Sequence, residues 1–242
     1  MPSRAIADTL VRETRIPGPD GRHESGHPAI AMVPRESSAL LVFAHGAGAG
    51  MRHPFMDGVA VALAERNVAT LRFEFPYMAE GRRRPDAPKR LTAAVRAVAR
   101  FAGEEYPDLP LFAGGKSLGG RMSSTSAVDG GIDVRGLVFF GFPLHAPGRD
   151  GTERSKHLES VRVPILFLQG SRDKLARIDL IRRVHDRLNN AGAPPRGVAR
   201  SSLHVLEDAD HSFRVPKRTG MTDSDVFAWL AEHAAAWMRE IV

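Results

Sequence analysis

The chain has 242 residues, of which 43% are hydrophobic and 26% are charged, a composition typical of a folded globular protein. It contains no cysteine, which excludes disulfides, thiolate metal sites and a cysteine nucleophile. Its formal net charge is +6, but only 7% of its residues are aromatic, so a nucleic-acid-binding face with stacked aromatic side chains is not indicated. The length predicts a single domain over residues 1–242.

The first 38 residues are rich in loops, and Pro17–Gly21 is typical of a turn. The segments on either side of this turn, Ile6–Thr14 and Ala29–Val33, are predicted to pair as a hairpin at the edge of a sheet. Charged residues interrupt Met1–Leu10, and no apolar run in the chain is long enough to span a bilayer. We therefore expect a cytoplasmic protein with no signal peptide and no membrane partner.

From residue 38 onward, short apolar runs alternate with segments of helical periodicity. Buried strands are predicted at Leu40–Ala44, Val68–Phe73, Leu111–Ala113, Leu137–Phe140, Ile165–Leu168 and Leu203–Leu206. Helices are predicted at Phe55–Arg66, Arg90–Phe101, Leu118–Val128, Ile178–Leu188 and Asp223–Val242. This alternation predicts an α/β fold with a mostly parallel, doubly wound sheet and helices on both faces. Ligands of such sheets bind at the carboxyl ends of the strands, so the residues that follow each strand are the candidates for a functional site.

A Gly-x-Ser-x-Gly pattern, Gly115-Lys116-Ser117-Leu118-Gly119, follows the third of these strands. A serine held in a tight turn between a strand and a helix needs small neighbours, and its hydroxyl is lifted above the sheet at a helix N-terminus. Free N–H groups at that terminus stabilise negative charge. The alternative is a glycine-rich connection with a helix-capping serine, but the strand and the helix around the pattern favour a nucleophilic Ser117.

The pair Lys116-Ser117 also resembles the end of a phosphate-binding P-loop. That motif requires a glycine where this chain has Pro110, so we discount it.

A second glycine-rich segment, His45–Gly50, follows the first buried strand. Its small residues let the backbone approach a ligand closely and leave N–H groups exposed. With the N–H of Leu118, an N–H of Ala47 or of Gly48 is predicted to form an oxyanion hole. The alternatives are a flexible loop or a phosphate-binding turn, although the signatures of the latter are missing. His45 itself is predicted to be structural and to pack under the loop.

Two more polar residues follow the last two strands. Asp173 could orient a histidine, or it could cap the next helix. His211 follows the last strand, and the chain order of serine, aspartate and histidine is typical of a catalytic triad on this kind of sheet. Asp208 or Asp210 could replace Asp173, but a residue so near His211 seldom reaches its ring.

The walls of the expected site are less well defined. The segment Phe142–Ser160 is too short for a folded cap and is predicted to be a loop, and the loop Phe75–Lys89 would form another wall. Four residues are predicted to lie near the substrate: Tyr77, Met78, Phe142 and Leu144. The cluster of basic residues from Arg82 to Arg90 is predicted to be solvated, with an anion-binding site as the alternative.

At these residues the chain resembles the α/β-hydrolase superfamily, from about Leu40 to the C-terminus. Its closest likeness is to the dienelactone-hydrolase-like branch. Within that branch it resembles short hydrolase-like proteins related to a subunit of the non-specific-lethal chromatin acetyltransferase complex. Three segments carry this closer likeness: Arg72–Tyr77, Gly114–Arg121 and Phe142–His145. True dienelactone hydrolases use cysteine where Ser117 stands, which argues against a dienelactone substrate.

The resemblance implies a serine hydrolase that cleaves small or medium acyl esters or thioesters through an acyl-enzyme. Ser117 would attack the acyl carbonyl, His211 would transfer the proton, and Asp173 would orient His211. This chemistry requires no metal or organic cofactor, and its partner is a small-molecule acyl substrate. Two alternatives stay open: a non-catalytic binding or scaffold protein of the same fold, and another serine chemistry such as that of a peptidase, acyltransferase or perhydrolase.

Overall fold

The computed structural model describes residues 8–18, 26–128, 130–146, 148–191 and 199–242. Its centre is one eight-stranded sheet with the strand order β1-β2-β4-β3-β5-β6-β7-β8. The strands are β1 (Thr9–Ile16), β2 (His27–Pro34), β3 (Ala39–Ala44), β4 (Val68–Phe73), β5 (Leu111–Lys116), β6 (Gly136–Phe140), β7 (Ile165–Gly170) and β8 (Ser201–Leu206). From β4 to β8 every neighbouring pair is parallel, whereas β1 and β2 are antiparallel additions at one edge. The predicted α/β fold with a mostly parallel sheet is confirmed.

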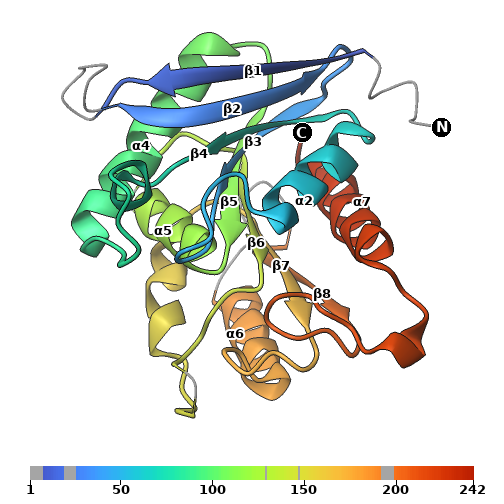
Figure 1. Ribbon diagram of the computed structural model, residues 1–242. Helices are drawn as coiled ribbons and strands as arrows, with labels where there is room; N and C mark the ends of the chain where they lie inside the picture. Colours follow the sequence, from blue (N-terminus) through green and yellow to red (C-terminus); the bar gives the residue numbers. More distant parts are fainter. Residues whose placement is uncertain (1–7, 19–25, 129, 147, 192–198) are drawn as a thin grey trace.

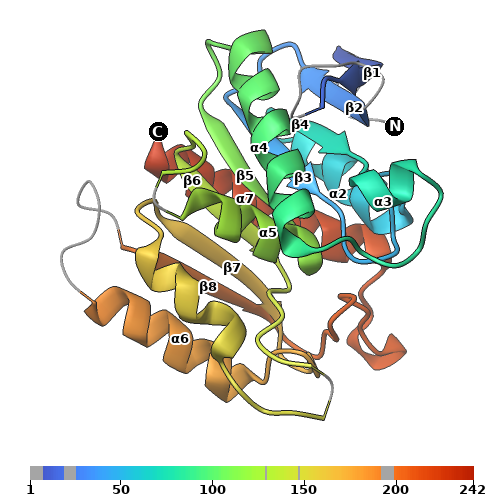
Figure 2. The ribbon, with the colours of Figure 1, turned by 90° about the vertical axis from the view of Figure 1, so that its left-hand side faces the viewer.

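Helices cover both faces of this sheet (Figures 1 and 2). On one face α2 (Pro54–Ala64) packs against α7 (Asp223–Ile241). On the other face lie α4 (Pro88–Glu105), α5 (Leu118–Ala127) and α6 (Ile178–Asn190).

The two faces of the sheet carry separate apolar cores. Alternate residues of β3 point to opposite faces: Leu40 and Val42 join the core under α4 and α5, while Leu41 and Phe43 join the core under α2 and α7. A strand buried on both faces must be apolar throughout, which explains the unbroken apolar run that predicted it.

The N-terminal hairpin is also confirmed, because β1 pairs with β2 at the sheet edge. Most of the expected turn at Pro17–Gly21, and the first residues of the expected strand from Ile6, lie outside the described residues.

Three short elements were not predicted. The expected loop Phe142–Ser160 contains a 3-10 helix, η1 (Glu153–Ser160), whose Leu158 is fully buried in the core. The loop Phe75–Lys89 contains α3 (Pro76–Ala79), and η3 (Lys217–Thr219) precedes α7. Elements of three to eight residues are too short to show helical periodicity, so the sequence pattern could not separate them from loops.

The carboxyl ends of the parallel strands meet at one edge of the sheet. Ala44 at the end of β3 is in register with Gly115, and Gly170 at the end of β7 is in register with Leu206 at the end of β8. The segments that follow β3, β5, β7 and β8 therefore converge there. Among the described residues, no helix has both the length and the apolar character to cross a bilayer.

Candidate active site

Ser117 occupies the turn between β5 and α5 with an unusual backbone conformation. Its φ is 50° and its ψ is −107°, a region that residues with a side chain seldom adopt. Such strain costs on the order of 1–3 kcal/mol and persists only where the surroundings enforce it. Here the Ser117 N–H donates to the Phe140 carbonyl, and the Ser117 carbonyl accepts from the N–H of Arg121. The Ser117 side chain does not cap the helix, so the helix-capping alternative is wrong.

The glycines on either side of Ser117 are required by close backbone approach. A Cβ atom at Gly115 would lie 2.1 Å from the Ala44 carbonyl oxygen, and one at Gly119 would lie 2.2 Å from the same oxygen. The end of β3 therefore passes directly against the Ser117 turn. This contact places the turn beside the loop that follows β3.

The structure brings Ser117, His211 and Asp173 together in a single series of hydrogen bonds. His211 Nε2 lies 2.9 Å from Ser117 Oγ, and His211 Nδ1 lies 2.7 Å from Asp173 Oδ2. A carboxylate only accepts, so Nδ1 carries the hydrogen and Nε2 is free to accept from the serine hydroxyl. The Asp173 side chain is fully buried, while the His211 ring is one-fifth exposed.

The other two candidate acids have separate roles. Asp210 Oδ1 accepts from the N–H groups of Ser212 and Arg214, at 2.8 and 2.9 Å, and so closes the turn that carries His211. Asp208 pairs with Arg218 on the surface. Neither carboxylate bonds to the imidazole, which leaves Asp173 as the acid beside it.

Gln169 is a buried polar residue that the sequence pattern did not single out. Its side-chain Nε2 donates to Asp173 Oδ2, and its Oε1 accepts from the Phe142 N–H at 3.0 Å. It therefore ties the acid to the segment that follows β6. The signal that could have found it is an amide side chain within the otherwise apolar strand β7.

The three predicted oxyanion donors differ in availability. The N–H of Leu118 is the first of α5, and no hydrogen bond within the described residues uses it or the N–H of Ala47. The N–H of Gly48, by contrast, donates to the Tyr77 hydroxyl at 3.1 Å. The geometry therefore favours Ala47 over Gly48 as the partner of Leu118.

His45 supports the loop that carries Ala47. It is completely buried; its Nε2 accepts from the Phe75 N–H at 3.1 Å, and its Nδ1 donates to the Gly46 carbonyl at 2.7 Å. Its ring meets that of Phe75 edge to face. The structural role predicted for His45 agrees with these contacts.

The predicted substrate wall needs correction. Tyr77, Phe142 and Leu144 have no exposed surface, because they belong to the apolar core beneath the strand ends. Tyr77 holds the Gly48 loop from below, and Phe142 packs against Phe139. These bulky side chains stay in the core because burying them stabilises the fold, so they do not line an opening. Met78 alone of the four is partly exposed.

A groove of about 480 Å³ opens beside His211. Its lining consists of Arg172, Lys174, Asp210, His211, Arg214, Val215 and Pro216. A larger hollow of about 790 Å³ lies at the opposite end of the sheet, near Leu111 and Arg135 at the amino ends of β5 and β6. The larger hollow is therefore remote from the Ser117–His211 pair, and the smaller groove is the one that adjoins it.

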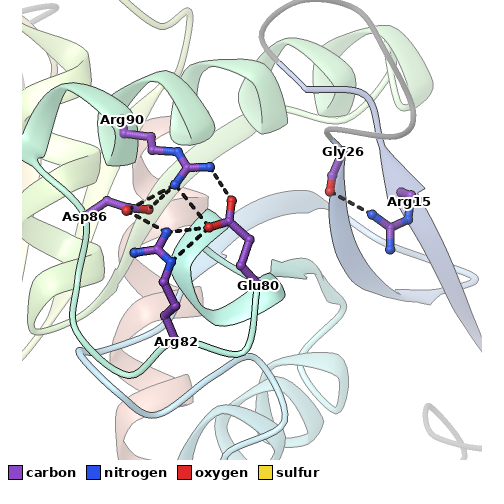
Figure 3. A network of polar contacts seen from close by, with 6 residues as sticks. All are labelled: Arg15, Gly26, Glu80, Arg82, Asp86 and Arg90. Atoms are coloured by element: carbon purple, nitrogen blue, oxygen red, sulfur yellow. Dashed lines mark hydrogen bonds and ion pairs between the residues drawn. The ribbon is translucent and has the colours of Figure 1, made fainter.

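Two of the five basic residues in the cluster after α3, Arg82 and Arg90, form ion pairs with nearby carboxylates (Figure 3). Glu80 and Asp86 each bond to both Arg82 and Arg90. The guanidinium groups of Arg90 and Arg82 lower the pKa of Glu80 to about 2. Arg82 and Arg90 are therefore occupied, which supports the predicted solvated surface rather than an anion site.

A His-Glu-x-x-His pattern occupies residues 23–27. In zinc hydrolases this pattern lies on a helix, because histidines four residues apart then share one face. Here His27 begins strand β2, and residues 19–25 lie outside the described part of the chain. The described residues contain no group of three or more His, Asp or Glu side chains arranged to hold a metal ion.

Comparison with known proteins places this geometry in context. Residues 37–239 match the family model described as an alpha/beta hydrolase domain. A Thermus thermophilus protein of known structure has a TM-score of 0.69 and 24% identity, covering 96% of this chain and 98% of that one. A dienelactone hydrolase from Anabaena variabilis has a TM-score of 0.72 and 17% identity, with the same coverage of 96% and 98%. A serine hydrolase without a lid from Xanthomonas campestris has a TM-score of 0.67 and 17% identity over 94% of each chain.

Proposed function

Because the chain belongs to the alpha/beta hydrolase domain family, we propose that it is a serine hydrolase cleaving small or medium acyl esters or thioesters. The observation that carries this proposal is the pair of hydrogen bonds joining Ser117 to His211 and His211 to Asp173. A serine hydroxyl is a weak nucleophile until a neighbouring base takes its proton, and that base works best when a third group fixes its ring. This arrangement supports acyl transfer through a covalent intermediate.

In the proposed reaction, Ser117 Oγ attacks the acyl carbonyl carbon while His211 Nε2 takes the hydroxyl proton. Collapse of the tetrahedral intermediate breaks the bond to the leaving group, which receives that proton from His211. Water then attacks the acyl-enzyme, again with His211 as the base, and releases the acid and free Ser117. Asp173 keeps the His211 ring oriented and stabilises its charged form in both steps.

The oxyanion of each intermediate would be held by the N–H groups of Leu118 and Ala47. Leu118 follows Ser117 at the start of α5, and Ala47 lies on the loop after β3, next to Gly46, whose backbone lies against Ser117. Losing one such donor typically lowers kcat about 10²- to 10³-fold. The sequence candidate Gly48 would join them only if its bond to Tyr77 opened.

The proposed substrate class follows from how little covers the site. Between β6 and β7, the described residues form only one element, the 3-10 helix η1, which is too small to enclose a long acyl chain. A serine at the nucleophile position argues against the dienelactone chemistry of the cysteine enzymes that the chain resembles. Its closer resemblance to the chromatin-complex relatives stays a prediction of the sequence.

A fluorophosphonate probe, which reacts covalently with activated serines, tests the proposal. We expect the purified protein to be labelled and to hydrolyse p-nitrophenyl acetate, and we expect Ser117→Ala to lose both. Ser38→Ala is the matched control and should behave as the wild type, because Ser38 directly precedes β3 and so lies at the amino ends of the strands, away from the site.

Failure of this test has a definite meaning. A folded protein that is neither labelled nor active on esters of graded chain length would favour the non-catalytic scaffold. Labelling without ester hydrolysis would favour another serine chemistry, such as that of a peptidase or acyltransferase, because the probe reports only the activated nucleophile.

A further inference from the structure

Lys116, the residue before the proposed nucleophile, is an unusual buried cation. It ends β5 with its side chain inside the protein, and its Nζ donates to the backbone carbonyl of His211 at 2.6 Å. Within the described residues its ammonium group forms no ion pair with a carboxylate. Burying a charge without a paired carboxylate costs free energy of folding, which suggests that the hydrogen bond from this ammonium group to His211 has a function.

The surroundings of Lys116 suit a cation but do not neutralise it. Its Nζ lies 5.8 Å from the ring centre of Phe55 and 5.5 Å from that of Phe213, and these two rings stack on each other. The charged groups that face it are Asp173 and Asp210, which act at longer range. From helix α2, the Phe55 ring faces the ammonium group. Burial lowers the pKa of Lys116 to about 8, while the two aspartates oppose this shift.

The segment that carries His211 is a tight turn. Asp210 closes this turn internally, through the N–H groups of Ser212 and Arg214. Phe213, the next buried residue, has a φ of 61°, which is strained for a residue with a side chain. The bond from Lys116 therefore links this strained turn to the strand that ends at Ser117.

We propose that Lys116 is a positioning residue, whose ammonium group binds the His211 carbonyl and so keeps the imidazole within hydrogen-bonding distance of Ser117. The inference rests on the proposed function, because the purpose of this tether is to align base and nucleophile. Since Lys116 and Ser117 are adjacent in the chain, any shift at the end of β5 carries the nucleophile and the tether together. A hydrogen bond from an ammonium group is roughly twice as strong as one from a neutral donor.

This role predicts an alkaline loss of activity that belongs to Lys116. As the pH rises through about 8, the ammonium group loses its proton and the tether weakens. Hydrolysis should therefore fall as the pH rises through about 8. The triad alone gives no reason for this alkaline decline.

The test compares pH profiles of kcat for p-nitrophenyl acetate in four proteins. We expect Lys116→Met, which fills similar space without charge, to lower kcat at least tenfold with little change in KM and to abolish the alkaline decline. Lys116→Arg should recover part of the lost activity and move that decline to higher pH. Lys89→Met, an exposed lysine on α4, is the control and should retain the wild-type profile. An alkaline decline unchanged in Lys116→Met, or wild-type kcat in that variant, overturns the proposal.

A second measurement does not depend on activity. The amide nitrogen of Ser212 is bonded to the His211 carbonyl carbon, so its NMR shift reports whether that carbonyl accepts from a charged donor. We expect this shift to titrate near pH 8 in the wild type and not in Lys116→Met. No titration in the folded wild type overturns the tether. If the shift titrates but no ester is hydrolysed, the tether exists and it is the proposed function that fails.

Discussion

Within the described residues the Asp173 carboxylate accepts three hydrogen bonds, one of them from His211. The other two come from the Leu175 N–H, at 2.7 Å, and from the Gln169 side chain. These bonds fix both oxygens of the carboxylate, so the imidazole meets an acceptor whose position is already set. Buried carboxylates persist when they are satisfied in this way.

Replacing Asp173 with asparagine tests this role at a single residue. The amide keeps the shape of the carboxylate but removes its charge, so it no longer stabilises the charged imidazole or holds its tautomer. We expect kcat for ester hydrolysis to fall by about 10³- to 10⁴-fold with a small change in KM.

Substitutions of two other aspartates, Asp208 and Asp210, serve as controls for this prediction. Asp208→Asn, which removes only a surface pair with Arg218, should leave kcat close to wild type. A larger loss in Asp210→Asn than in Asp173→Asn would contradict the assignment and move the role of the acid to Asp210.

At the scale of elements, the start of α5 must pass within van der Waals contact of the end of β3. Alanine in a helix is favoured over glycine by about 1 kcal/mol, but a Cβ at position 119 would overlap the backbone of Ala44 and His45. Overpacking of this kind costs typically 1–3 kcal/mol, so the overlap outweighs the helix preference. We expect Gly119→Ala to lower the free energy of unfolding by about 1–2 kcal/mol and to reduce ester hydrolysis, because Leu118 must move.

Helix α4 supplies the matched control for this prediction. Gly103 lies in α4 with open space where a Cβ would stand, so Gly103→Ala should raise the free energy of unfolding by up to about 1 kcal/mol. Urea unfolding monitored by circular dichroism gives both values. Equal effects of the two substitutions would show that close approach to β3 does not constrain α5.

The groove beside His211 is formed by the segments that follow β7 and β8, and it carries three cations. Arg172, Lys174 and Arg214 line it without forming an ion pair within the described residues. We expect an ester with a carboxylate in its acyl part, such as p-nitrophenyl hydrogen succinate, to be hydrolysed several-fold faster in kcat/KM than p-nitrophenyl butyrate. The advantage should shrink as salt is added, because salt screens exposed charges.

Substitution of one groove cation tests whether the substrate preference depends on the groove or on the net charge of the protein. Arg214→Gln should lower the succinate-to-butyrate ratio, whereas Arg83→Gln, an exposed residue of the basic cluster, should leave it unchanged. A ratio that responds equally to both variants would show that net charge, and not the groove, sets the preference.

At the scale of the whole molecule, the loss of the Lys116 proton at alkaline pH should lower activity but raise stability. Its pKa is about 8 in the folded protein, whereas in the unfolded chain the group stays protonated to about pH 10.4. Between these values the unfolded state binds more protons, so the free energy of unfolding rises with pH. Relative to Lys116→Met, the wild type should gain on the order of 3 kcal/mol from pH 7 to pH 10.5.

Urea titrations of both proteins at several pH values measure this gain. A stability difference between them that does not vary with pH would show that the lysine is not a buried cation. We expect activity to fall and the free energy of unfolding to rise at alkaline pH. This result would show that the buried charge supports catalysis although it destabilises the fold.

The amino-acid sequence by itself determined a mostly parallel sheet, the succession of strands and helices along the chain, and the residues that follow each strand. Strands buried on both faces must be apolar, and a serine between a strand and a helix needs glycine neighbours, so both features can be recognised in a short stretch of sequence. The contacts between distant segments were decided by the tertiary structure alone. It engaged the Gly48 N–H with Tyr77, placed Phe142 in the core and joined Lys116 to His211. Each of these outcomes depends on which residues meet across segments far apart in the chain, and local patterns carry no record of those distances.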